Sequence, residues 1–254
     1  LKMRFVHLMM PCIMIRLMFV IYFYKDNFNF LTECKAFFWA LGSEFNGYPT
    51  VGMIWFLFAL FWAETLIDLV SVIFRSEENK YFIYYGLCII GLFLGIKGKW
   101  LPQNFDVAFV ATLFIIIGML WHQDEIVINK FLHAILPLAF FSWLYCFFKG
   151  FYIGMAGRFY PGISISLFEA ICAVFVVCCI CKGLASNIVV SGTLSFMGRH
   201  TLAIYCIHYF DPAFRFLWQS DKIMYVCIWR VIIIMGLFLI YYYCSTFLIT
   251  FKKR

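Results

Sequence analysis

The sequence predicts an all-α fold: a polytopic transmembrane helix bundle of about eight spanning helices, forming a single membrane-embedded domain over residues 1–254. The first observation is composition, since 65% of the residues are hydrophobic and only 13% are charged. A soluble domain has about half apolar and about a quarter charged residues. The second is a mean hydropathy of +0.92. The third is the length of the apolar runs, because a spanning helix needs about 20 such residues. Together these observations exclude a soluble globular protein, a disordered chain and a nucleic-acid-binding module.

The predicted spanning helices are apolar runs bounded by polar or charged segments. They cover about 7–24, 51–74, 81–96, 105–121, 131–148, 163–181, 200–218 and 223–250. Eight spans use roughly 160 residues, so only short loops remain between them. Segment 25–50 is too polar to span, and its amphipathic part 30–41 is expected to lie in the membrane interface.

The loop charges predict the orientation of the bundle. The net charge is +7, and the basic run 252–254 directly follows the last helix. Because Lys and Arg concentrate in cytoplasmic loops, we expect both termini in the cytoplasm and a multi-pass protein of the inner (plasma) membrane. The opposite face receives loop charges such as Lys97, Lys99 and Arg158.

The eleven cysteines lie mostly inside apolar runs, where they are expected to act as small, buried, apolar side chains. Cys178 and Cys181 have CxxC spacing, but no histidine or second CxxC lies nearby. We therefore predict no metal site.

A charge inside a bilayer costs about 2.5–3.5 kcal/mol on insertion scales, so each such residue needs a structural or functional reason. Arg16 and Glu64 lie near the middle of the first two predicted helices. Asp68, Ser71 and Arg75 follow Glu64 at helical spacing and are predicted to share its face. Two interpretations stay open, a structural Arg16–Glu64 pair or the wall of a substrate or cofactor channel.

Glu169 and Arg230 lie at similar depths in the predicted helices 163–181 and 223–250. A structural ion pair between them is the favoured interpretation.

Histidine is the natural general base of an enzyme, although in membranes it is often a packing residue. His122 and His133 lie at helix ends and are interpreted as interfacial. His7, His200 and His208 lie within more specific sequence patterns.

Residues 194–208 read LSFMGRHTLAIYCIH and form the most specific string in the chain. This string resembles the closing motif of the acyltransferase-3 family of integral-membrane O-acyltransferases. The positions in register are Gly198, Arg199, Thr201, Leu202, Ile204, Tyr205 and His208.

Further stretches resemble that family in the same order along the chain. Residues 55–61 read WFLFALF and resemble a helix start of the family, and 101–106 read LPQNFD and resemble its loop-then-helix segment. The segment that runs from Lys2 and Arg4 to Pro11 resembles the basic segment that opens the family's third helix. The resemblance thus spans essentially the whole chain.

Two departures from the family pattern change the expectations. The match begins at the family's third helix, so two helices and the histidine taken as the family's base are expected to precede this sequence. The chain alone is therefore expected not to complete acyl transfer at the family's rate. Some members carry arginine–x–x–arginine at the basic segment, whereas this sequence has Arg4 followed by His7.

The resemblance implies transfer of an acyl group, usually acetyl, from acetyl-CoA as co-substrate to a hydroxyl of a cell-surface sugar or lipid-linked glycan. Expected partners are membrane lipids, acyl-CoA and the glycan acceptor, with no nucleic acid. The implied catalytic candidates are His208, Tyr205 and His7, and the implied contacts to the donor's phosphates are Arg4, Arg75 and Arg199. Two alternatives stay open, a transporter or flippase of lipid-linked sugars and a non-catalytic remnant of the acyltransferase fold.

Overall fold

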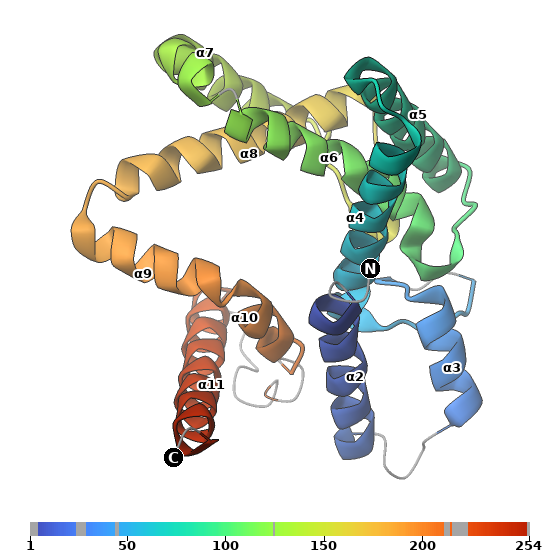
Figure 1. Ribbon diagram of the computed structural model, residues 1–254, viewed down its shortest axis with the longest axis vertical. Helices are drawn as coiled ribbons and strands as arrows, with labels where there is room; N and C mark the ends of the chain where they lie inside the picture. The colour runs from blue at the N-terminus through green and yellow to red at the C-terminus, as the bar shows by residue number, and fades with distance from the viewer. Residues whose placement is uncertain are drawn as a thin grey trace. The chain divides into compact units, whose positions relative to one another are not determined.

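The structure is a computed structural model that describes residues 5–23, 29–43, 46–123, 125–210, 214 and 223–252. Within these ranges, the side chains of 7, 22–23, 125–134 and 245–252 lie outside the description. Every regular element of the described part is helical, which confirms the predicted all-α class (Figure 1). The described residues fall into two compact units. The first unit lies within 1–10 and 27–184, and the second within 11–26 and 185–254.

The first unit contains most of the long helices. Its elements are η1 (Phe5–Met9), α3 (Phe30–Trp39), η3 (Gly52–Ile54), α4 (Trp55–Ile73), α5 (Glu77–Ile96), η4 (Pro102–Asn104), α6 (Phe105–Gln123), α7 (Glu125–Phe148), η5 (Met155–Gly157) and α8 (Ser164–Leu184). Helices α4 and α5 both pack against α6, and α7 packs along α8. Buried apolar side chains join these pairs, among them Leu92 and Val110 between α5 and α6, and Ala139 and Val176 between α7 and α8.

The second unit contains α2 (Met10–Phe23), α9 (Ile188–Arg199), α10 (Thr201–His208) and α11 (Ile223–Lys252). Helix α10 packs against α11. Helix α2 reaches the end of α10 through aromatic contacts, since the ring centroids of Phe19 and Tyr209 lie 4.9 Å apart. A helix near the start of the chain is thus joined to one near its end.

Within the described residues, five helices are long and apolar enough to span a membrane. They are Gly52–Ile73, Glu77–Ile96, Pro102–Gln123, Ser164–Leu184 and Ile223–Cys244. Two shorter apolar helices, Met10–Ile21 and Ile135–Phe148, match two more of the predicted spans. The protein is therefore a multi-pass membrane protein.

Two predicted elements differ from the structure. Segment 188–199 was not among the predicted helices but forms α9. The helix expected over 200–218 begins after a backbone break at His200 (φ −112°, ψ 14°) and ends, as α10, at His208. Helix α4 ends at Ile73, because Phe74 adopts an extended conformation (φ −107°, ψ 124°). Arg75 therefore lies beyond the helix. The spacing had predicted that Arg75 shares the helical face of Glu64, and this prediction is wrong.

Candidate functional site

Tyr205 and His208 lie on α10, and both are half-buried. The Nδ1 atom of His208 is shielded from solvent and, among the described residues, has no hydrogen-bond partner. Tyr205 lies close to Cys12 of α2 and to Cys206 of its own helix. A shielded imidazole nitrogen without a partner is open to exchange a proton with a substrate group that docks beside it.

The residue after His208 joins α10 to α2. Arg16 of α2 is buried, and its Nη1 donates a hydrogen bond of 2.8 Å to the hydroxyl oxygen of Tyr209. Arg16 thus has a polar partner within its own unit. The expected pairing of Arg16 with Glu64, which belongs to the first unit, stays a prediction.

The remaining residues of the expected site belong to both units, and two of them are not fully described. Arg4 lies outside the described residues, and of His7 only the backbone in η1 is described. Arg75, in the link between α4 and α5, is exposed. Arg199 is exposed at the end of α9, where its Nε donates to the carbonyl of Ser195 at 3.3 Å. The grouping of these residues around one donor stays a prediction.

His200 lies at the break between α9 and α10, beside three aromatic rings. Its ring centroid is 4.8 Å from Phe196, 5.6 Å from Phe238 and 5.4 Å from Tyr242. These contacts pack the motif against α11. Gly198 of the same motif is loosely surrounded, because a Cβ added there would meet nothing within 4 Å.

The sequence interpretation missed a buried polar cluster in the first unit. Arg158 follows η5 and was expected to be a solvated loop charge, but its side chain is only 1% exposed. Its Nε donates to Oδ2 of Asp106 at 2.9 Å, and its Nη2 donates to Oδ1 of Asn104 at 2.6 Å and to Oδ1 of Asp106 at 3.2 Å. The guanidinium carbon lies 4.0 Å from the centroid of the Trp100 ring. This geometry uses both the planar fork and the stacking face of arginine. We call Trp100, Asn104, Asp106 and Arg158 the arginine cluster.

The arginine cluster holds several chain segments at one end of the helices. Asn104 donates to the carbonyls of Ala40 and Trp55, so it connects the segment after α3 to the start of α4. Gln103 donates to the last carbonyls of α3, including that of Phe38. These bonds satisfy backbone groups that a helix end leaves without partners. The side chains of Asn104, Asp106 and Arg158 thus hydrogen-bond to groups within the protein. We interpret the cluster as structural, because it holds the adjoining segments together.

Tyr160 is buried close to Arg158 and Asp106 of the arginine cluster. Burial raises the pKa of its phenol, and the positive charge of Arg158 opposes this increase. Its hydroxyl is buried and has no hydrogen-bond partner among the described residues. The phenol therefore stays protonated and neutral at physiological pH.

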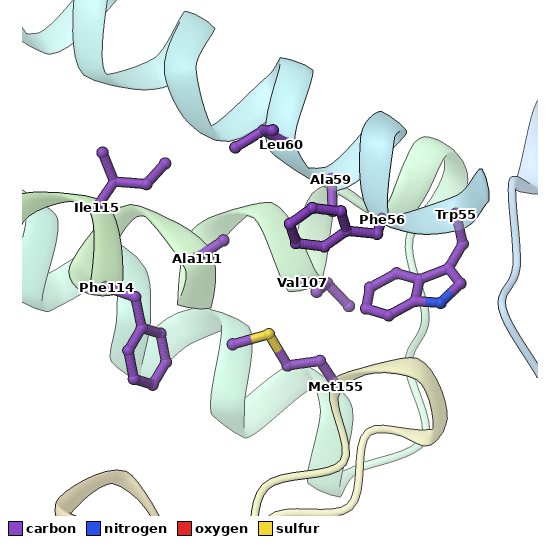
Figure 2. A pocket seen from close by; sticks show the side chains of 9 residues that line it. All are labelled: Trp55, Phe56, Ala59, Leu60, Val107, Ala111, Phe114, Ile115 and Met155. Atoms are coloured by element: carbon purple, nitrogen blue, oxygen red, sulfur yellow. The ribbon is translucent and has the colours of Figure 1, made fainter. Parts of the chain in front are cut away.

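An apolar hollow of about 260 Å³ lies next to the arginine cluster. Side chains from α4, from α6 and from η5 line it, as Figure 2 shows. They are Trp55, Phe56, Ala59, Leu60, Val107, Ala111, Phe114, Ile115 and Met155.

Glu169 of α8 is buried within the first unit and shares a hydrogen bond with Trp143 of α7. Its expected partner Arg230 is an exposed residue of the second unit, and that ion pair stays a prediction. In the part of the chain that the structure describes, no group of histidine, cysteine or carboxylate residues is arranged to hold a metal ion.

The sequence was compared with known families, curated proteins and solved structures. The acyltransferase-3 family, described as an acyltransferase domain, matches residues 1–245. No curated protein and no solved structure matches the chain. A family match over nearly the whole length, together with apolar helices long enough to cross a bilayer, identifies the chain as a membrane acyltransferase of the acyltransferase-3 family.

Proposed function

We propose that this membrane acyltransferase moves an acyl group, usually acetyl, from acyl-CoA to a hydroxyl of a cell-surface sugar or lipid-linked glycan. The observation that carries the proposal is the imidazole of His208, whose Nδ1 is shielded from water and has no hydrogen-bond partner among the described residues. It lies next to the buried contact between Tyr209 and Arg16.

The proposed chemistry needs a base and a donor for the oxyanion. His208 takes the proton from the acceptor hydroxyl as the alkoxide oxygen attacks the thioester carbonyl carbon. The resulting tetrahedral oxyanion accepts a hydrogen bond from the hydroxyl of Tyr205. The carbon–sulfur bond then breaks, the CoA thiolate leaves with the electron pair, and the imidazolium returns the proton to it.

The test is turnover by the full chain in proteoliposomes supplied with radiolabelled acetyl-CoA and sugar acceptors. His208→Ala is expected to lower kcat by about 10²–10⁴-fold, the usual contribution of a positioned general base. His122→Ala is the matched control, because His122 is exposed at the end of α6.

Unchanged kcat in the His208 variant would remove this residue as the base. Acceptor movement across the membrane without release of CoA would favour the transporter alternative. Absence of both activities, also when the chain is preceded by the two expected helices, would favour the non-catalytic alternative.

A further inference from the structure

The apolar hollow between α4 and α6 has walls made almost entirely of carbon. Among its lining side chains, only the indole nitrogen of Trp55 and the thioether sulfur of Met155 are not carbon. No charged side chain lines it. The hollow therefore offers neither the cations that phosphates require nor the hydrogen bonds that a sugar requires.

Small residues create this space. Ala59 of α4 and Val107 of α6 are buried and belong to its lining. Ala111 lies one helical turn after Val107, and in Figure 2 its methyl group lies between Val107 and the larger Phe114. Because Ala59 on α4 and Ala111 on α6 have only a methyl group, a gap remains between the larger side chains that line the hollow.

One end of the hollow is fixed by the arginine cluster. Asn104 donates to the carbonyl of Trp55 at 3.3 Å, and Arg158 donates to the carbonyl of Ala156, which follows Met155, at 3.0 Å. Val107 directly follows Asp106 of the cluster. The walls at this end are therefore held in place without an occupant.

The hollow lies between two helices of a kind that can cross a bilayer. Apart from Met155, its lining residues lie in the first two turns of α4 and in the first three turns of α6, and both helices are long and apolar enough to span a bilayer. Trp55 is the first residue of α4, a position typical of tryptophan at the membrane interface. Phe56, the next lining residue, is 42% exposed, so the space opens to the surface of the unit.

Size and chemistry together select the occupant. A volume of about 260 Å³ is below the roughly 300–1,000 Å³ of pockets that enclose a drug-sized ligand. A second protein copy would need a contact of about 800 Å² on each partner, far more than this hollow offers. Water does not stay in apolar cavities, and an empty one loses dispersion contacts along its lining.

We propose that this hollow is a lipid site that binds one acyl chain of a bilayer phospholipid, which enters between α4 and α6 with its headgroup at the level of Trp55. This inference does not depend on the reaction that the protein catalyses.

The test uses the full chain in phosphatidylethanolamine and phosphatidylglycerol vesicles that contain a phosphatidylcholine with a diazirine in the middle of one acyl chain. After illumination, labelled peptides are located by mass spectrometry. We expect label on the lining segments of α4 and α6 and on the peptide that contains Met155. Ala111→Leu, which fills the hollow, is expected to lose most of this label.

The matched control adds the same side chain elsewhere on α6. A Cβ at Gly118 meets nothing within 4 Å, so Gly118→Leu is expected to leave the label on the lining residues unchanged. If Ala111→Leu fails to fold, Ile115→Trp fills the hollow from its rim and is expected to give the same loss.

Equal labelling in the filled and unmodified proteins would overturn the proposal. It would also be overturned if the unmodified protein carried label elsewhere on its surface but none on the lining residues.

Discussion

At the scale of single residues, Arg158 shows how a charged side chain can stabilise the fold through a buried ion pair. Its partner Asp106 has a fully buried side chain and also accepts a hydrogen bond from the backbone N–H of Leu101 at 3.2 Å. A buried pair of this kind makes little net contribution compared with apolar replacements, but losing one partner leaves an uncompensated charge. Replacing one member of the pair is therefore expected to cost more stability than replacing both with apolar residues.

We expect Arg158→Met to destabilise the protein by about 3–5 kcal/mol, because Asp106 then remains buried without its cation. Arg158→Lys is expected to recover little, since an ammonium group cannot bridge Asp106 and Asn104 while stacking on Trp100. Thermal unfolding in detergent measures both effects. Lys99→Met, a change at an exposed basic residue, serves as the control. A double variant with Asp106→Leu that is no more stable than Arg158→Met would contradict this account.

Arg199 gives a second prediction at this scale, and it rests on the proposed donor. Its guanidinium is exposed at the end of α9, where it can meet an anionic cofactor. Arg199→Ala is expected to raise the KM for acyl-CoA while kcat changes little, because only binding of the donor is weakened. Steady-state kinetics with Lys99→Ala as the control decides the question, and an unchanged KM would remove Arg199 from the donor site.

At the scale of secondary-structure elements, the packing of α5 on α6 depends on the close approach of the two backbones at Gly91. A Cβ at Gly91 would lie only 2.5 Å from the backbone oxygen of Asp106, and backbone atoms cannot rotate away. On the same helix, a Cβ at Gly86 meets nothing within 4 Å. Helices in membranes commonly use small residues in this way to bring their backbones together.

We expect Gly91→Ala to destabilise the protein by about 1–3 kcal/mol, since the added methyl group forces α5 and α6 apart. Gly86→Ala adds the same methyl group in open space and is expected to leave stability unchanged or slightly higher. The comparison is made by thermal unfolding in detergent. Equal losses of stability in the two variants would show that the contact with Asp106 is not the cause.

The chain as a whole is divided so that α2 belongs with the C-terminal helices. Residues within 11–26 cluster with 185–254, although most of the intervening sequence forms the first unit. The Arg16–Tyr209 hydrogen bond and the Phe19–Tyr209 ring contact form part of this association.

A chain cut after Leu184 and produced as two pieces is therefore expected to reassemble through α2 and α10. Co-purification of 185–254 with a tagged 1–184 piece from membranes measures this. Tyr209→Phe keeps the aromatic ring but removes the hydroxyl partner of Arg16, at a cost of about 1–3 kcal/mol. It is expected to lower the yield of the complex. Equal yields with and without the hydroxyl would argue against a role for the hydrogen bond in assembly.

Composition and hydropathy were enough to predict the helical membrane fold, because a spanning helix leaves a long local pattern. The predicted helix 105–121, for example, corresponds to α6. The arginine cluster was not predictable in this way, since Arg158 and Asp106 are 52 positions apart and no local pattern indicates that they pair. The motif around His200 indicated the family, yet its helix break depends on backbone conformation that the side-chain pattern does not reveal.

The hydrogen bond from Arg16 to Tyr209 joins residues 193 positions apart, and this separation imposes an order on biosynthesis. At about 5–20 residues per second, a ribosome takes roughly 10–40 seconds to reach the tyrosine after it has made the arginine. During that interval α2 cannot make its contacts with α10. The association of α2 with α10 therefore belongs to the last stage of synthesis.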